Sequence, residues 1–531
     1  MPKTEMTIQV GKDGQMNITD VATSAKQNLN QPANNTGSTF KSMPWGEKWC
    51  YIKDLVTVEP LLMLYIFGNI LVLPAFKNLK LQKACLVDSG FEDIICQRII
   101  AGESAEFNLT EEVNTVHLHI ANASSWLVPI TTILPMILSL FWGSYSDRYQ
   151  IRKPFLLLPL CGEILSTMSC ILSTIFLRQW NLTTLLASAY FTSTCLGGQT
   201  LLVVALFAYI ADVSSVEERT LRIGVCQTAL SIAQISSNAL SGILFQHIGY
   251  YGVFCTSFCS LVLGLLYGIF YVKDNLKSRN ENKKCILVDL FDATLILETI
   301  RVILVKKVGN NRLYIILLMA IFFIYNGVFA GEDEIFFFYL NAMLGFDAVN
   351  YSYVITYANL LNLKGLILGT YLFTKVFKFT DYTIIIITFI NKIIGNIVMA
   401  AAANKIMIYI GVYIELFNRV TIITLRSLAT KVVRQEDLGK VQSFFGIFES
   451  LGGAVFVPIY NQLIFANTQT NFPSAFMYGA LLFFGICILI VFFMRLKERQ
   501  VLSGGTNDMN ENKQGIDNPA MIVANTEISH M

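Results

Sequence analysis

The sequence predicts an all-α membrane protein with twelve transmembrane helices in two six-helix bundles. Its 531 residues are 54% hydrophobic and only 14% charged, with a mean hydropathy of +0.54, whereas a soluble chain carries about 25% charged residues. A helix that crosses the hydrocarbon layer needs roughly 20 mostly apolar residues, and twelve segments meet that requirement. A long basic linker divides these segments six and six.

The predicted spans lie near residues 55–76, 121–142, 155–177, 184–210, 223–245, 251–272, 311–340, 351–373, 382–403, 406–426, 441–465 and 473–494. Within the linker, residues 286–307 carry an apolar stripe at helical spacing, which predicts an amphipathic helix along the inner membrane face. Two halves around such a linker are typical of secondary transporters, whose substrate site lies near the midplane between the halves.

We therefore divide the chain into five parts. They are a disordered cytoplasmic tail (1–50), a first bundle with an outer loop at 77–120 (51–272), the linker (273–310), a second bundle (311–495) and a second disordered cytoplasmic tail (496–531). Both tails are polar and lack apolar periodicity. We expect no signal peptide before the first span.

The charges of the loops place both termini in the cytoplasm, because Lys and Arg gather on the cytoplasmic side of membrane proteins. The inner loops hold most of the basic residues outside the spans, and the opposite short loops hold little beyond Arg178 and Lys405. N-x-S/T triplets at Asn108, Asn181 and Asn350 fall in the outer loops, so we predict glycosylation there. The net charge of +2 gives no sign of nucleic-acid binding.

Cysteine placement predicts one disulfide bond. Of eleven cysteines, only Cys85 and Cys96 lie in a predicted outer loop, and disulfides persist on the oxidising side of a membrane. We predict that these two are bridged; two free thiols are the alternative.

Enzyme motifs are missing from the sequence, which contains no G-x-S-x-G, P-loop or H-E-x-x-H and only four histidines. We expect neither enzymatic activity nor a cofactor or bound metal. Three of the histidines, His117, His119 and His247, lie near the predicted outer face.

The loop between the second and third spans reads "GSYSDRYQIRKP" and resembles the corresponding loop of the major facilitator superfamily. Its matching residues are Gly143, Asp147, Arg148, Arg152 and Lys153. The resemblance implies the fold of that superfamily and a role for the aspartate in holding the inner gate shut, near a helix end. The family normally has a glycine before the basic pair, where this chain has "YQI". The alternative is a solvated loop that only enforces topology.

Three further stretches resemble solute carrier family 46, the family of the proton-coupled folate transporter. They are "VTVEP", "YIADVSSVEERTLR" and "LRSLATKVVRQEDLGKVQS". The resemblance implies an anion-binding or coupling role for Arg426. Gln227 stands where the folate transporter has a glutamate, that transporter's span-4 aspartate falls at about Gly198 and Gln199, and its histidine has no counterpart. Proton coupling would then use other carboxylates.

Ionisable residues within the spans are candidates for the transport site, since a charge at the bilayer centre costs roughly 2.5–3.5 kcal/mol and normally faces a cavity or a partner. They are Glu59, Glu163, Glu332, Asp333, Glu334, Lys364, Lys392, Glu415, Arg419 and Glu449. Glu415 and Arg419 stand one helical turn apart, a spacing that permits an ion pair for function or for insertion alone. Lys392 would meet lipid unless it snorkels or pairs.

The sequence therefore predicts a secondary active transporter that moves a folate-like organic anion by alternating access, with protons as a candidate coupling ion. The alternatives are a transporter of muropeptides or cyclic dinucleotides, and a non-transporting receptor or scaffold with the same fold. The predicted partners are a small organic anion, protons and the lipid bilayer. We expect the plasma membrane, with the lysosomal or endosomal membrane as the alternative.

Overall fold

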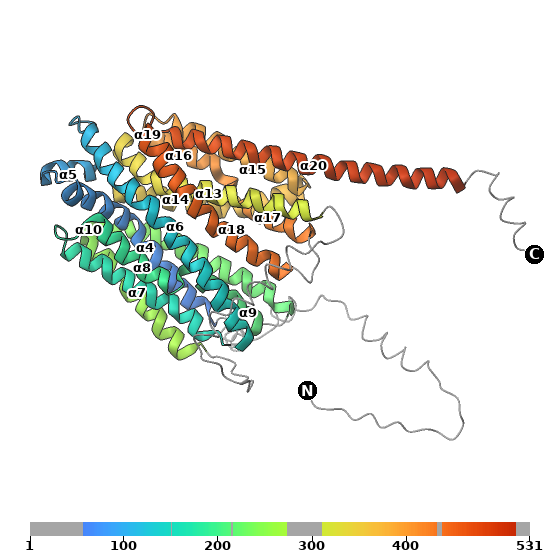
Figure 1. Ribbon diagram of the computed structural model, residues 1–531, viewed down its shortest axis with the longest axis horizontal. Helices are drawn as coiled ribbons and strands as arrows, with labels where there is room; N and C mark the ends of the chain where they lie inside the picture. The colour runs from blue at the N-terminus through green and yellow to red at the C-terminus, as the bar shows by residue number, and fades with distance from the viewer. Residues whose placement is uncertain (1–56, 150, 214–215, 273–310, 433–437, 517–531) are drawn as a thin grey trace, which may run out of the picture. The chain divides into compact units, whose positions relative to one another are not determined.

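The computed structural model describes residues 57–149, 151–213, 216–272, 311–432 and 438–516, and within them it contains helices and no strand (Figure 1). The expected linker helix, the first tail and residues 517–531 of the second tail lie outside these residues. The last helix, α20 (Ala475–Ile516), continues beyond residue 495, where we placed the end of the second bundle.

Helices of the first half run from α4 to α10. They are α4 (Glu59–Lys83), the short π-helix η1 (Ala84–Asp88), α5 (Asp93–Ala101), α6 (Thr110–Tyr149), α7 (Lys153–Ile175), α8 (Leu182–Cys195), α9 (Gly198–Val213) and α10 (Val216–Tyr271).

Helices of the second half begin at α13. They are α13 (Asn311–Leu344), α14 (Ala348–Tyr371), η2 (Leu372–Val376), α15 (Asp381–Ala400), α16 (Lys405–Ile414), η3 (Glu415–Phe417), α17 (Asn418–Val432), α18 (Leu438–Pro458), η5 (Ile459–Phe465), α19 (Ala466–Thr468) and α20.

Ten of the described helices are long and apolar enough to cross a membrane. One of them, Val225–Tyr271, joins the predicted fifth and sixth spans across a kink at Gly249, whose φ of 66° is left-handed. Helix α14 is 24 residues long but falls outside the ten because of its polar side chains, among them Asn359, Asn362 and Lys364. Dividing α10 at the kink and adding α14 restores the twelve predicted spans.

The first span is longer than the sequence predicted. Helix α4 has Pro60 in its first turn, where the missing N–H of a proline costs no hydrogen bond within the helix. The helix continues to Lys83. Serines of α10 hold it along its length, since Ser257 donates to the Gly68 carbonyl and Ser241 to the Leu71 carbonyl, both at 2.7 Å. These bonds satisfy polar groups that would otherwise be buried unpaired.

Two spans are broken near their middle. The fourth breaks between α8 and α9, where Gly197 and Gly198 have φ of 89° and 51°. The tenth breaks at η3, a single 3-10 turn at Glu415–Phe417. These are the fourth spans of their respective halves, and discontinuous helices at corresponding places are a mark of transporter binding sites.

The two halves pack through neighbouring helices, α10 against α14 and α6 against α18. At the first contact, the Gly242 amide donates to Ser352 Oγ at 3.0 Å, and Ser352 donates in turn to the Asn238 carbonyl. A side chain at Gly242 would meet Ser352 Oγ at 2.8 Å, so the absence of one allows the close approach.

The predicted Cys85–Cys96 disulfide is confirmed, with a Cα–Cα distance of 5.7 Å. It ties the π-helix after α4 to α5, and both cysteines are buried. Closing a loop of this size stabilises a fold by up to ~3 kcal/mol in the chain-entropy model.

Candidate functional site

A cavity of about 300 Å³ lies between the two halves. Helices α4 and α10 line it from the first half, and α13 to α17 with α20 line it from the second. Its ionisable side chains are Lys77, Lys392, Arg419, Glu332, Asp333 and Glu415. We call it the central cavity.

Lys392 of α15 is the centre of the polar wall. Its ammonium bonds both carboxylate oxygens of Glu415 at 2.9 Å and Glu332 Oε2 at 3.0 Å. Asn396, one turn along α15, donates to Glu332 Oε1 at 2.5 Å. Lys392 is 5% exposed and Glu332 is 8% exposed. Of the alternatives considered for Lys392, the structure shows pairing: the lysine faces inward, where it is ion-paired with two carboxylates.

Backbone geometry makes room for this cluster. A side chain at Gly395 of α15 would meet Glu415 Cγ at 2.3 Å, so only a glycine lets Glu415 reach Lys392. The 3-10 turn at Glu415 also departs from the α-helix. The side-chain amide of Asn391 donates to the Ile414 carbonyl at 2.6 Å, which satisfies a backbone acceptor at the break.

Glu415 and Arg419 do not form the ion pair that their spacing permits. The i,i+4 rule assumes a continuous α-helix, and the break at η3 turns Glu415 toward Lys392 instead. Arg419 lies with its guanidinium 5.5 Å from the ring centroid of Phe329, a cation–π distance. Among the described residues no carboxylate is paired with it.

Arg419 also lines a neighbouring cavity of about 210 Å³. This second space shares Gln234, Asn359 and Asn362 with the central cavity and extends to Gln227. The predicted candidates Gln227 and Arg419 are thus connected through adjoining polar spaces.

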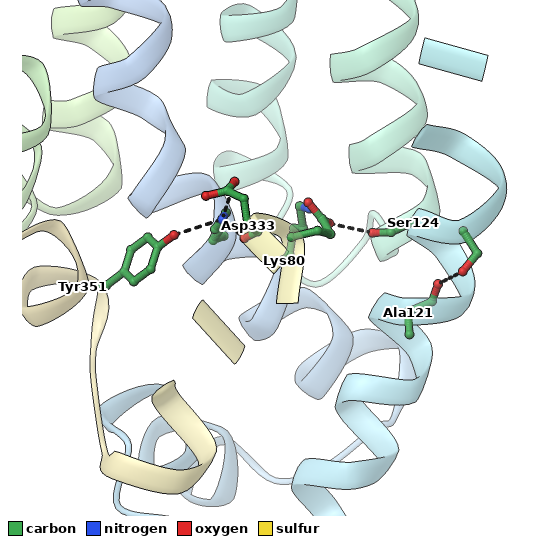
Figure 2. Close-up of polar contacts among 8 residues, drawn as sticks. Lys80, Ala121, Ser124, Asp333 and Tyr351 are labelled. Carbon is green, nitrogen blue, oxygen red and sulfur yellow. Dashed lines mark hydrogen bonds and ion pairs between the residues drawn. The ribbon is translucent and has the colours of Figure 1, made fainter. Parts of the chain in front are cut away.

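Ion pairs join the halves at the end of α4 that we predict to be outer. The Lys77 ammonium donates to Asp333 Oδ2 at 3.1 Å, to the Asp333 carbonyl at 2.6 Å and to Tyr351 Oη at 3.0 Å. Lys80 bonds Glu334 Oε1 at 2.7 Å, and Ser124 donates to that oxygen at 3.1 Å. Figure 2 shows both groups of contacts between the helices.

The gate motif forms contacts within the first half. Arg152 Nε bonds Asp212 Oδ2 at 2.7 Å, and Asp212 belongs to the "YIADVSS" stretch. Lys153 donates to the Ile269 carbonyl at 2.6 Å. Arg148 is exposed, with its guanidinium over the Tyr149 ring. Gly143 packs near Val204, and the side chain of Asp147 lies outside the described structure.

Arg426 and Glu59 line neither of these two cavities. Arg426 bonds Glu449 at 3.1 Å across α17 and α18, and its side chain is 41% exposed. Glu59 is 3% exposed and accepts from the Val58 amide at 3.0 Å. Their predicted roles stay predictions, and neither residue joins the Lys392 cluster.

The three predicted glycosylation sites differ in local structure. Asn108 is exposed between α5 and α6. Asn181 caps α8, with Oδ1 accepting from the Thr184 amide at 2.8 Å. Asn350 lies in the first turn of α14 and is partly buried.

Sequence reasoning missed Lys77, Lys80 and Asn396. The sequence could have indicated the two lysines, because they follow an apolar run and are spaced as on one helix face, but our prediction places them in the outer loop. Asn396 lies one turn from Lys392 on α15, and that spacing alone pointed to a shared face.

Comparison with protein families finds a match to the Major Facilitator Superfamily model over residues 61–457. A relative from Gallus gallus, named "Lysosomal proton-coupled steroid conjugate and bile acid symporter SLC46A3", is 25% identical and covers 82% of this chain and 93% of its own length. The "Proton-coupled folate transporter" of Bos taurus is 26% identical, with 80% and 89% covered. The "Probable peptidoglycan muropeptide transporter SLC46" of Drosophila melanogaster is 20% identical, with 82% and 84% covered.

Solved structures share the fold. The human organic anion transporter MFSD10 (TETRAN) has a TM-score of 0.54 at 14% identity, covering 82% of this chain and 98% of its own. A D-xylose-proton symporter has a TM-score of 0.51 at 13% identity, with 81% and 97% covered. At these identities the likeness shows the fold alone.

Proposed function

The chain belongs to the major facilitator superfamily, and from that premise we propose that it is a proton-coupled transporter of amphipathic organic anions, which pass through the central cavity by alternating access. It is a multi-pass membrane transporter, as its relatives are, and not an enzyme. The observation that carries the proposal is the buried Lys392–Glu332–Glu415 cluster of the second half, which lines the cavity between the halves.

Charge balance in the cavity supports an anionic substrate taken up with a proton. The lining holds three basic and three acidic side chains, so an anion alone would leave an uncompensated buried charge, which is costly. A proton on Glu332 or Glu415 removes one partner of Lys392. An N–H group of the Lys392 ammonium is then free to donate a hydrogen bond to the carboxylate or sulfate of the substrate.

The apolar part of the lining supports an amphipathic substrate. Phe329, Phe336, Met399 and Phe476 face the same space as the charges. Ligand sites combine such apolar walls with a few placed polar groups. Steroid conjugates and bile acids, named for one group of relatives, have a large apolar body and one acidic group. Folate remains a second candidate through its carboxylates.

The proposal applies to a plasma membrane with an acidic exterior and to a lysosomal membrane, since the lysosomal lumen is topologically equivalent to the cell exterior. A relative named as lysosomal supports the second location. Microscopy of a tagged full-length chain against a lysosomal marker distinguishes the two.

Uptake by cells that express the full chain tests the proposal, with radiolabelled oestrone sulfate as the probe at about pH 5.5 and about pH 7.4. We expect faster uptake at the lower pH and competition by bile acids. Folate and a muropeptide are the other competitors. Competition by only one of these would assign the substrate to that class and overturn the steroid-conjugate proposal.

Arg419→Gln and Arg426→Gln form a matched pair in this assay. Arg419 lines the cavity and Arg426 does not, so we expect Arg419→Gln to raise the KM about 10- to 150-fold, the equivalent of one charge-assisted hydrogen bond of roughly 1.5–3 kcal/mol. Arg426→Gln should leave the KM near the wild-type value. The reverse order would place the anion site beside Arg426, where α17 contacts Glu449 of α18, and not in the central cavity.

A further inference from the structure

A third cavity, of about 290 Å³, lies inside the first half. Helices α4, α6, α7, α8 and α9 line it, and Leu73 of α4 lines both this cavity and the central one. We call it the N-half cavity. One helix therefore separates it from the proposed substrate site.

Glu163 of α7 is the acidic side chain in this lining. Ser193 donates to its Oε1 at 2.6 Å and Tyr65 donates to the same oxygen at 3.2 Å. In the described part of the chain no lysine, arginine or histidine is paired with Glu163. The side chain of Asn69 is a further hydrogen-bond partner. Glu163 is thus a carboxyl group within the membrane that is held by neutral hydrogen-bonding groups.

Other titratable groups around the cavity are neutral side chains. Cys170 of α7 and Tyr190 of α8 line it, and α4, α6 and α9 contribute no charged side chain to the lining. Tyr65 of α4 contacts Glu163 from outside the lining. Lys80 lies 6.0 Å from the Tyr190 ring, but its ammonium is bonded to Glu334. No cation in the lining compensates a negative charge on Glu163.

The position of Glu163 corresponds to that of Lys392. Each lies about midway along the third span of its half, α7 or α15. Each faces the helix that leads to a mid-membrane break, because Glu163 binds Ser193 of α8 and Lys392 binds Glu415 at η3. A side chain on the neighbouring Gly162 would meet Ser193 Cα at 3.1 Å, much as one on Gly395 would meet Glu415. The two halves thus build related polar sites, one ion-paired and one not.

We infer that Glu163 in the N-half cavity is a proton-binding site of the transport cycle, separate from the substrate site. The inference rests on the proposed proton-coupled function. An unpaired carboxylate within the membrane is costly, whereas a carboxylic acid is neutral and can donate a hydrogen bond. The proton is taken up when the cavity is wet and retained while it is closed.

Helix α4 provides the physical link to the rest of the molecule. Tyr65 of α4 bonds Glu163, and the same helix carries Lys77 and Lys80, which bind Asp333 and Glu334 of the other half. Loss or gain of the proton changes the bond that Tyr65 makes. A change in the position of α4 then acts on the pairs that join the halves.

Infrared difference spectroscopy of the purified full chain in lipid tests the protonation without any substrate. Between about pH 5.5 and about pH 8 we expect a carbonyl stretch of a protonated carboxyl group that Glu163→Gln removes. Glu106→Gln is the matched control, because Glu106 is an exposed carboxylate between α5 and α6. If Glu163→Gln leaves every such band in place, the inference is overturned.

Proteoliposomes with oestrone sulfate test the role in coupling. We expect Glu163→Gln to lose accumulation driven by a pH gradient but to keep exchange of labelled for unlabelled probe. Ser193→Ala should keep accumulation and move the pH midpoint of accumulation upward, because the lost hydroxyl favoured the charged carboxylate of Glu163. If Glu163→Gln folds poorly, Ser193→Ala tests the same site in its place. Full gradient-driven accumulation by Glu163→Gln would overturn the inference and leave the proposed function standing. If the wild-type protein exchanges the probe but does not accumulate it under a pH gradient, proton coupling itself would be overturned.

Discussion

Lys392 is the residue on which the central cavity depends most, because it is ion-paired with two carboxylates at once. Removing one partner of a buried ionic cluster costs about 3–5 kcal/mol, since it leaves uncompensated charge. We therefore expect Lys392→Met to lower the melting temperature of the purified chain and the fraction that elutes as a single species.

A neutral cluster separates folding from transport. Lys392→Met combined with Glu332→Gln and Glu415→Gln removes all three charges, so we expect the melting temperature to recover while uptake stays lost. Recovery of uptake in the triple variant would show that the charges serve folding alone.

At the scale of single residues, the sequence predicted which side chains matter better than it predicted how they pair. Glu332, Asp333, Glu415, Lys392 and Arg419 were recognised as costly charges in apolar spans, and the structure brings all of them to one cavity. Their partners depend on which helices are neighbours in the fold. The spacing of residues along one helix does not reveal that. For this reason the Glu415–Arg419 pair was wrong and the Lys392–Glu415 pair was missed.

At the scale of elements, the break in the tenth span positions the site. Helix α14 packs against it so closely that a side chain at Gly365 would come 1.7 Å from the Leu416 carbonyl oxygen. An alanine there must push the two helices apart. We expect Gly365→Ala to destabilise the chain by about 1–3 kcal/mol and to raise the KM for the probe, because Glu415 adjoins Leu416.

Gly485→Ala is the matched control for this prediction. Gly485 lies in α20, and nothing would lie within 4 Å of a side chain there, so an alanine should be neutral or stabilise the helix by roughly 0.5–1 kcal/mol. Thermal unfolding of both variants is the measurement. Equal melting temperatures would contradict the tight packing at the break.

Element boundaries were predictable where apolar runs end in polar loops and not where charges are paired inside the protein. We predict that the first span ends near residue 76, yet α4 continues to Lys83, and Lys77 and Lys80 are ion-paired with carboxylates on α13. The sequence has no proline or glycine at Glu415–Phe417 that would predict the break there. It depends on glycines of the neighbouring helices α14 and α15 instead.

At the scale of the whole molecule, alternating access requires that contacts joining the halves at one end break while those at the other end form. The Lys77–Asp333 and Lys80–Glu334 pairs close the end predicted to be outer. Lys80 is 1% exposed in its side chain and Glu334 is 15% exposed, so this end must open for a substrate to enter from outside.

A reversible crosslink across this contact tests the central claim most directly. The double variant Lys80→Cys with Glu334→Cys would be oxidised in proteoliposomes, and exchange of labelled oestrone sulfate measured before and after a mild reductant. Each single variant controls for loss of the ion pair. We predict that the oxidised double variant stops exchange, that reductant restores it, and that both single variants are insensitive to oxidation. Exchange at an unchanged rate by the fully crosslinked chain would contradict transport by alternating access through this cavity.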